Sequence, residues 1–269
     1  MTFALGPRAA SAGYRLFAFD KAGSTNAEAM SRAREGERGP AWFVTTEQTA
    51  GRGRRQRAWI APRGNLASSV LEVMDVSPAV AATMGFAFGL AHEAALQRIS
   101  IEANLRLVGS DQLKYLLKWP NDILVRGHKL CGLLVEAEAV DGGLAVVAGI
   151  GTNIIAAPEG TPTPATSLAA LGVHISAEEL FSAQSDAWVE LSGIWDKGRG
   201  FAEIRKLWLE RAAGLGERVA INTGAATVEG TFDTIDDTGC LIVRTTEGRR
   251  VPVTAGEVYF GNAASVGAA

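Results

Sequence analysis

The run from Leu116 to Ile150 constrains the fold most, because strand-forming apolar stretches alternate there with turn signals. Pro120 cannot donate to a β-ladder, and Asn121-Asp122 favours a turn, so this point ends one strand and begins another. Further turns and the strands between them are predicted, in order, at Gly127-His128, Leu130–Val140, Asp141-Gly142-Gly143 and Leu144–Ile150. The run therefore predicts strands joined by hairpins in one β-sheet.

Helices are predicted before and after this run. Apolar residues three or four positions apart predict a helix over Pro78–Gln97, and a capping box at Ser176 and Glu179 begins another over Ser176–Gly198. Thr25 and Glu28 have the same capping-box spacing, which predicts a helix through Ala33. The remaining elements predicted in this part are a helix over Phe201–Ala213 and strands over Tyr14–Phe19, Ala41–Thr46 and Asn65–Val73.

The sequence changes character at Gly214–Glu217. Short strands separated by Gly-rich and Asp-rich turns follow from Arg218 to Phe260, which predicts a small SH3-like barrel. We therefore expect an α+β protein: a mixed β-sheet flanked by helices over residues 1–214, and a β-barrel over residues 215–269.

A basic loop interrupts the first part between Thr45 and Trp59. Arginines alternate with glycines in it, and like charges so close repel by up to ~4 kcal/mol per pair at 4 Å in a surface dielectric. We expect the loop to become compact only around a dense anion, which arginine grips in bidentate fashion. A solvated basic loop or a nucleic-acid patch is the alternative. The arginines are Arg52, Arg54, Arg55 and Arg57.

The overall charge favours a small anionic ligand over nucleic acid. The formal net charge is −3, whereas dedicated nucleic-acid binders carry a basic excess. Cys131 and Cys240 lie far apart with no secretory signal ahead of them, so we expect reduced thiols and a cytoplasmic location. The longest uncharged stretch, residues 76–92, is too short for a membrane span and predicts a buried helix. A Pro-rich segment, Ala156–Thr166, predicts a surface loop.

Several polar residues are candidates for a site, each with a structural alternative. Lys129 opens an apolar strand, which is costly unless it is paired or reaches water along an edge. Ser24, Thr25 and Asn26 begin a helix and either cap it, the favoured interpretation, or bind a polar group. Gly149 and Gly151 permit a ligand close to the backbone.

Four motifs in order give the chain a family resemblance: GRGRRQRAW, KWPND, KLCGLLVE and GIGTN. With Ser24-Thr25-Asn26 and Gln48 at matching places, the chain resembles the biotin protein ligase family from about Phe17 to Phe260. The resemblance implies a class II synthetase-like catalytic domain of the biotin–lipoate ligase type. It also implies a reaction in which biotin and ATP form biotinyl-5′-AMP and pyrophosphate, followed by transfer to a lysine of a biotin carboxyl carrier domain.

The resemblance also assigns roles to residues. Lys129 and Arg54 would be catalytic, and Asp122 would contact Mg²⁺. Trp59 would close over the adenylate. Phosphate or ATP would contact Lys118, Asn121, Asp122 and Asn153. Biotin or its adenylate would contact Ser24, Thr25, Asn26, Gln48, Gly51, Arg52, Gly53, Arg54, Arg57, Trp59, Lys129, Gly132, Gly149 and Gly151.

The chain departs from the family pattern in three places. No helix-turn-helix segment precedes Tyr14, so we expect a ligase that does not bind DNA. Ile99–Lys114 is longer than the usual link and fits a surface loop or an interface, and Cys131 replaces a common alanine. A lipoate or octanoate ligase, and a silent sensor of biotin or its adenylate, are the alternative functions. A homodimer is compatible with the sequence, and no membrane partner is expected.

Overall fold

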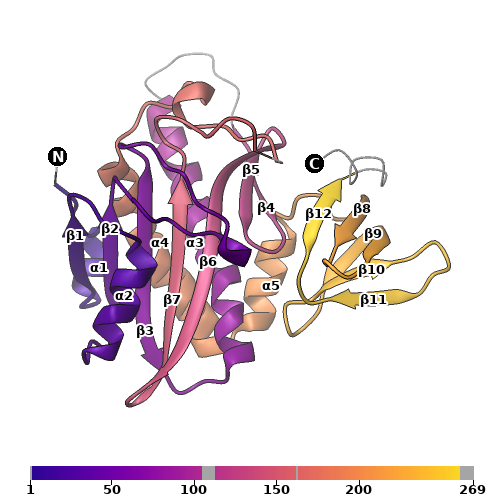
Figure 1. Ribbon diagram of the computed structural model, residues 1–269, viewed down its shortest axis with the longest axis horizontal. Coiled ribbons are helices and arrows are strands. Elements are labelled where there is room, and N and C mark those ends of the chain that lie inside the picture. The colour runs from indigo at the N-terminus through magenta and orange to yellow at the C-terminus, as the bar shows by residue number, and fades with distance from the viewer. Residues whose placement is uncertain (1, 105–112, 162, 261–269) are drawn as a thin grey trace.

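A seven-stranded mixed sheet forms the frame of the first part of the chain (Figure 1). The computed structural model describes residues 2–104, 113–161 and 163–260. Only the first two strands run parallel, and every other neighbouring pair is antiparallel. In spatial order the strands are β1 (Arg15–Phe19), β2 (Ala41–Thr45), β3 (Leu66–Met74), β7 (Gly143–Thr152), β6 (His128–Val140), β5 (Asp122–Val125) and β4 (Tyr115–Lys118).

Helices cover both faces of this sheet, which confirms the predicted α+β class (Figure 1). The larger core lies under α3 (Pro78–Asn104) and α4 (Ala177–Trp195), and α2 (Thr25–Arg34) covers a smaller apolar cluster on the opposite face. The predicted capping box at Ser176 and Glu179 forms and begins α4. The remaining helical segments are α1 (Pro7–Ser11), α5 (Phe201–Leu209), and short 3-10 turns at Arg54–Gln56, Ala169–Leu171 and Asp196–Gly198.

Helix α3 is longer than predicted, because it continues past Gln97 to Asn104. At Gly89 a Cβ would lie 3.6 Å from Leu117 and Leu133, in ordinary contact, so the packing of α3 on the sheet does not require glycine there. By length and composition Pro78–Ala103 could cross a membrane, but 72% of the 18-residue stretch that meets this test is buried inside the molecule, as in a core helix. The predicted insertion at Ile99–Lys114 is thus partly helix, and residues 105–112 lie outside the described residues.

A five-stranded antiparallel sheet follows α5, which confirms the short strands predicted from Arg218 to Phe260. Its terminal strands, β11 and β12, are not paired with each other within the described residues, so the sheet is SH3-like in size but is not closed into a barrel. Its buried side chains join the main core. In spatial order the strands are β11 (Arg250–Val253), β10 (Leu241–Arg244), β9 (Thr227–Ile235), β8 (Arg218–Asn222) and β12 (Glu257–Phe260).

The C-terminal sheet is joined to the first sheet near KWPND. The backbone of Leu117 exchanges hydrogen bonds with Arg211 and Ala213, both at 2.9 Å. The indole Nε1 of Trp119 donates to the carbonyl of Gly239 at 3.1 Å. These contacts bring strand β12 to the end of the first sheet where the motif residues gather.

Candidate active site

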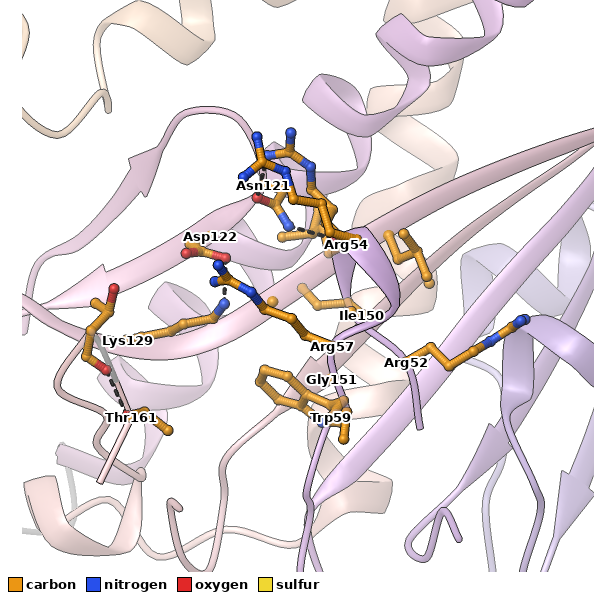
Figure 2. Close-up of a pocket in the computed structure, with 18 of the residues that line it drawn as sticks. Arg52, Arg54, Arg57, Trp59, Asn121, Asp122, Lys129, Ile150, Gly151 and Thr161 are labelled. Atoms are coloured by element: carbon orange, nitrogen blue, oxygen red, sulfur yellow. Dashed lines mark hydrogen bonds and ion pairs between the residues drawn. The ribbon is translucent and has the colours of Figure 1, made fainter. Parts of the chain in front are cut away.

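One cavity of about 260 Å³ gathers the predicted site residues, and only Gly51 among them does not line it. Its floor is formed by the start of β5, the first part of β6 and the end of β7, its side is the start of α2, and the basic loop covers it (Figure 2). Six basic side chains line it against two acidic ones, Asp122 and Glu257. Such an excess of positive charge over a small enclosed volume favours a polyanionic ligand.

A β-bulge aims Lys129 into this cavity. The pairing of β5 with β6 shifts by one residue between Ile123 and Leu124, so Leu130 and Cys131 both face the core. Because strand side chains otherwise alternate, the extra residue puts Lys129 on the same side as Gly132. Alternation along the sequence could not reveal this bulge.

Lys129 has a partner in the protein. Its Nζ forms an ion pair with Oδ1 of Asp122 at 2.7 Å, and this buried carboxylate oxygen has no further hydrogen-bond partner. Asp122 therefore supplies a countercharge of the kind that a lysine at the start of an apolar strand requires.

Lys118 and Arg54 are less well compensated. Burial lowers the pKa of the Lys118 ammonium, which neighbouring Asp122 partly opposes. Burial, and then the nearby charge of Arg55, lowers the pKa of the Arg54 guanidinium. Within the described part of the chain neither side chain forms an ion pair with a carboxylate, so both favour an added anion.

The arginines of the loop have acceptors within the protein, which the expectation drawn from their charges did not include. Each arginine has an acceptor: Arg52 meets Glu136, Arg54 meets Asn121 and the Gly256 carbonyl, Arg55 meets the Thr223 carbonyl, and Arg57 meets Glu257. These acceptors lie far along the chain, so the sequence of the loop does not reveal them. Arg55 and the following glutamine, Gln56, adopt left-handed φ values of 55° and 60°, which cost a non-glycine residue about 1–2 kcal/mol each.

The polar groups at the start of α2 form hydrogen bonds with other parts of the protein and do not cap the helix through a side chain. Ser24 is the N-cap but makes no side-chain capping bond, so the predicted box at Thr25 and Glu28 is wrong. The amide nitrogen and hydroxyl of Thr25 both donate to Oε1 of Gln48, at 2.8 and 3.2 Å. The hydroxyl of Ser24 makes no protein hydrogen bond within the described residues, and it lines the cavity.

The glycines of the floor make room for protein side chains. A Cβ at Gly149 would lie 1.9 Å from Oδ1 of Asn26, and one at Gly151 would lie 2.2 Å from Nε1 of Trp59. The Trp59 ring lies beside Gly151 in Figure 2, and Nζ of Lys129 is 5.5 Å from its centroid. The indole Nε1 is buried without a hydrogen-bond partner. These glycines therefore do allow a group to approach the backbone closely, as predicted, but the groups that lie there are the side chains of Asn26 and Trp59.

A second buried polar atom of the cavity lining, in Asn153, has no hydrogen-bond partner. Asn153 is 1% exposed, and its Nδ2 donates to the Thr166 carbonyl at 3.1 Å while its Oδ1 makes no hydrogen bond. The Pro-rich segment lies at the surface as predicted, and it also forms a wall of the cavity, because Lys129 exchanges backbone hydrogen bonds with Pro164 and Thr166. Its lining residues, which sequence analysis missed, are Pro158, Thr161, Thr163 and Ala165.

Strand β12 contributes a further part of the cavity that the motifs did not indicate. Gly256, Glu257 and Val258 line it, and Glu257 pairs with Arg57. The Arg57 guanidinium lowers the pKa of the Glu257 carboxyl. Glu257 lies 200 residues after Arg57 in the sequence, so no local pattern could signal the contact.

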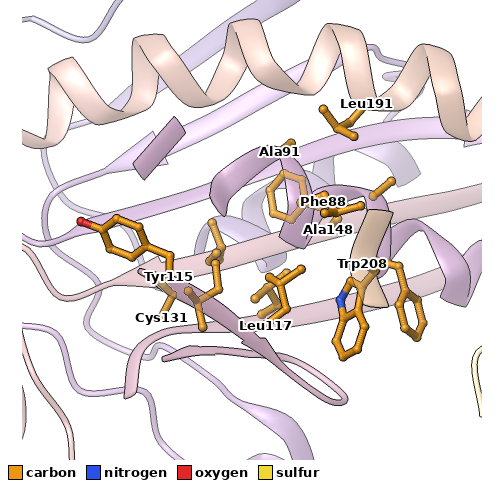
Figure 3. Packing of buried hydrophobic residues seen from close by; sticks show 14 of the residues in the cluster. Phe88, Ala91, Tyr115, Leu117, Cys131, Ala148, Leu191 and Trp208 are labelled. Carbon is orange, nitrogen blue, oxygen red and sulfur yellow. The ribbon is translucent and has the colours of Figure 1, made fainter. Parts of the chain in front are cut away.

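The floor rests on the main core, where Tyr115, Leu117 and Cys131 pack together below the strands (Figure 3). Burial raises the pKa of the Cys131 thiol to about 12, which leaves it a protonated packing group. His92 is fully buried and its Nε2 lies 2.8 Å from the hydroxyl of Thr152, the residue before Asn153.

The residues fit Mg²⁺ only as an ion held mainly by phosphates. Across residues 2–104, 113–161 and 163–260, no group of three or more His, Cys, Asp or Glu side chains could hold a metal. Asp122 offers one carboxylate with an unused oxygen position. Magnesium binding through one or two carboxylates and substrate phosphates matches this donor set.

Two family matches define the class of protein. Residues 24–153 match the biotin/lipoate A/B protein ligase family, and residues 214–261 match the biotin protein ligase C-terminal domain. The fold agrees: a biotin protein ligase from Aquifex aeolicus in complex with biotin and ATP superposes with a TM-score of 0.72 and 23% identity, over 92% of this chain and 99% of that chain.

Sequence relatives narrow the class. A biotin–[acetyl-CoA-carboxylase] ligase of Paracoccus denitrificans is 38% identical over 88% of this chain and 97% of its own length. The enzyme of the same name from Mycobacterium tuberculosis is 34% identical over 88% of this chain and 85% of its own length. The chain belongs to the biotin protein ligase family.

Proposed function

We propose that this chain is an ATP-dependent biotin protein ligase. The observation that carries the proposal is the cavity itself, in which six basic side chains converge and two of them, Lys118 and Arg54, lack a carboxylate partner among the described residues. A triphosphate and a carboxylate must be brought together there despite their repulsion. Preorganised positive charge is the principal means by which a protein makes this approach favourable.

In the first step, an oxygen of the biotin carboxylate attacks the α-phosphorus of ATP, and the bond to pyrophosphate breaks. Lys129 lies at the floor of the cavity and stabilises the carboxylate and the charge that develops on the new linkage. Arg54 faces the phosphates, and Asn121 positions its guanidinium by accepting from Nη1 at 3.3 Å. Mg²⁺, bound through the phosphates and Asp122, would neutralise further charge.

The free polar atoms divide the cavity between the two substrates. The unpartnered Ser24 hydroxyl, with Thr25 and Gln48 beside it, suits the polar ring of biotin. The unpartnered Oδ1 of Asn153 suits an N–H donor such as the amino group of adenine. A buried acceptor without a donor costs about 1–3 kcal/mol, which such a ligand would recover.

In the second step, the amine of an acceptor lysine attacks the acyl carbon, loses a proton, and AMP leaves. The acceptor would be a biotin carboxyl carrier domain of a biotin-dependent carboxylase, by analogy with the relatives named for acetyl-CoA carboxylase. Trp59 and the basic loop cover the cavity and would limit the access of water to the mixed anhydride. A cytoplasmic location and the boundary near residue 214 are parts of this proposal.

Pyrophosphate exchange tests the function directly. Labelled pyrophosphate should enter ATP when biotin and Mg²⁺ are present, without any acceptor protein, and should not do so with lipoate. Exchange with lipoate or octanoate alone would identify the other ligase of this fold. Binding of biotin without exchange would identify a sensor.

A further inference from the structure

Glu136 lies outside the cavity lining, yet it contacts both of the elements that hold biotin in the proposed function. It is carried by strand β6, and its side chain is 33% exposed. Its Oε2 accepts from Nδ2 of Asn26 at 2.8 Å, and its Oε1 accepts from Nη2 of Arg52 at 3.4 Å. One carboxylate thus connects the start of α2 to the first arginine of the loop.

Glu136 helps to occupy the hydrogen-bonding capacity of Asn26. Both amide hydrogens of Asn26 are used, since Nδ2 also donates to the Leu134 carbonyl at 3.3 Å. Its Oδ1 accepts from the Ser69 hydroxyl at 2.7 Å. With these partners Asn26 fixes the start of α2 and the space above Gly149, and the hydroxyl of Ser24 is left to meet a ligand.

The bond to Arg52 holds one side of the loop. Arg55 and Arg57 reach the C-terminal sheet, at Thr223 and Glu257. Within the part of the chain that the structure describes, Arg52–Glu136 is the only ion pair between the loop and the first sheet. This pair therefore adds a charged contact with β6 to the backbone hydrogen bonds that Thr49 and Ala50 donate to Ala22 and Gly23.

We propose that Glu136 is a positioning residue for the ligase reaction. It places Arg52 against the cavity and locks Asn26 below it, so that the loop retains the acyl-adenylate until the acceptor lysine arrives. This inference rests on the proposed function for the identity of the retained group. The contact between Glu136 and Arg52 does not depend on the identity of that group and is tested separately.

The decisive variant is Glu136→Gln, which keeps the shape and an oxygen for Asn26 but removes the charge that pairs with Arg52. Glu138→Gln is a matched control, because Glu138 lies two residues further along β6 and pairs with Arg34 of α2 outside the cavity, with Nε to Oε1 at 2.8 Å. Both variants should unfold at a temperature close to that of the parent protein. A partly exposed pair contributes little to global stability.

Trypsin cleavage after Arg52 reports the contact without any ligand. Loss of the pair should speed cleavage by about two- to fivefold in Glu136→Gln and leave it unchanged in Glu138→Gln. High salt screens the pair and should therefore raise the cleavage rate of the parent protein toward that of Glu136→Gln. The cleavage rate of Glu138→Gln at the same salt concentrations corrects for general effects of salt. Equal cleavage in the parent and both variants would overturn the proposed anchoring of the loop.

Release of the acyl-adenylate reports the consequence for the reaction. It should be faster by about two- to fivefold in Glu136→Gln, and Arg52→Gln should add nothing further in the double variant. Additive effects of the two substitutions would show that Glu136 does not act through Arg52. If the parent protein shows no biotin-dependent pyrophosphate exchange, the proposed function fails, whereas the cleavage result still decides whether Glu136 holds the loop.

Discussion

Lys129 and Asp122 form an ion pair across adjacent strands, with Nζ of the lysine 2.7 Å from Oδ1 of the aspartate. The pair is partly buried, with side-chain exposures of 25% and 14%. It holds the ammonium at the cavity floor through a contact within the protein. Asp122 therefore has two roles to reconcile, as the countercharge of Lys129 and as the proposed contact for Mg²⁺.

Replacement of Lys129 by alanine should abolish most adenylate formation. The ammonium stabilises charge that develops during attack on phosphorus, and loss of one such group costs on the order of 10²–10³-fold in rate. The variant should remain folded, because the side chain lies at a strand entry and outside the main core. Pyrophosphate exchange at saturating biotin and ATP measures the effect.

Lys21→Ala is the matched control for that experiment. Lys21 also pairs with a carboxylate, Glu47, with Nζ 2.9 Å from Oε1, but it does not line the cavity. Its replacement should leave exchange unchanged. A near-parental rate in Lys129→Ala would contradict the assigned role of Lys129.

Deletion of residues 216–269 should leave a folded first sheet with sharply reduced activity. Arg54, Arg55 and Arg57 would lose their acceptors on the C-terminal sheet, and Glu257 would be removed from the cavity. Stability should also fall, because the buried side chains of the two sheets form one core. Circular dichroism and pyrophosphate exchange on the truncated chain measure both effects, and full activity would exclude β12 from the site.

Substrates should protect the arginine loop from trypsin. The free loop is held by partly exposed contacts, and an adenylate would add anionic partners for the same guanidinium groups. Biotin with ATP and Mg²⁺ should therefore slow cleavage after Arg52, Arg54, Arg55 and Arg57, whereas lipoate should not.

Arg54→Gly should weaken the closed loop, because Arg54 joins Asn121 to the Gly256 carbonyl. Activated biotin should then escape and label lysines of unrelated proteins, which streptavidin blotting detects. The parent protein serves as the control at equal adenylate concentration. If substrates do not change the cleavage rate and lysines of unrelated proteins are not labelled, the loop does not retain the intermediate.

The buried imidazole of His92 should make stability depend on pH. Burial lowers its pKa from 6.5 to about 3, so below pH 6.5 the unfolded chain takes up a proton that the folded protein does not. Stability is then lost as the pH falls from 6.5 toward 3, by about 1.4 kcal/mol per pH unit, or about 2 kcal/mol at pH 5. Urea unfolding at pH 7 and pH 5 measures it.

His92→Gln should lose this acid sensitivity, since glutamine does not titrate. His128→Gln is the control, because His128 is exposed on the turn before Lys129. The same acid-dependent loss in His92→Gln and the parent protein would show that another group is responsible.

Local patterns predicted most of the elements and their order. The hairpins after KWPND, the capping box of α4 and the short C-terminal strands were confirmed, because each depends on neighbouring residues. The predicted capping box at Thr25 is wrong because residues distant in sequence compete for its polar groups. Gln48 and Ser69, both distant in sequence, take up the groups that would have formed it.

The amino-acid sequence by itself determined which chemical groups are available: the arginines, Lys118, Lys129 and the polar start of α2. Their spacing also determined the strands and helices that carry them. Only the tertiary structure decided their partners, because the bulge beside Lys129, the anchoring of the loop by Glu136 and the contribution of Glu257 all depend on contacts across the sheet or between the two sheets. Electrostatic compensation acts through space, so the loop that looks self-repelling in sequence is held by carboxylates, an amide and carbonyls far along the chain.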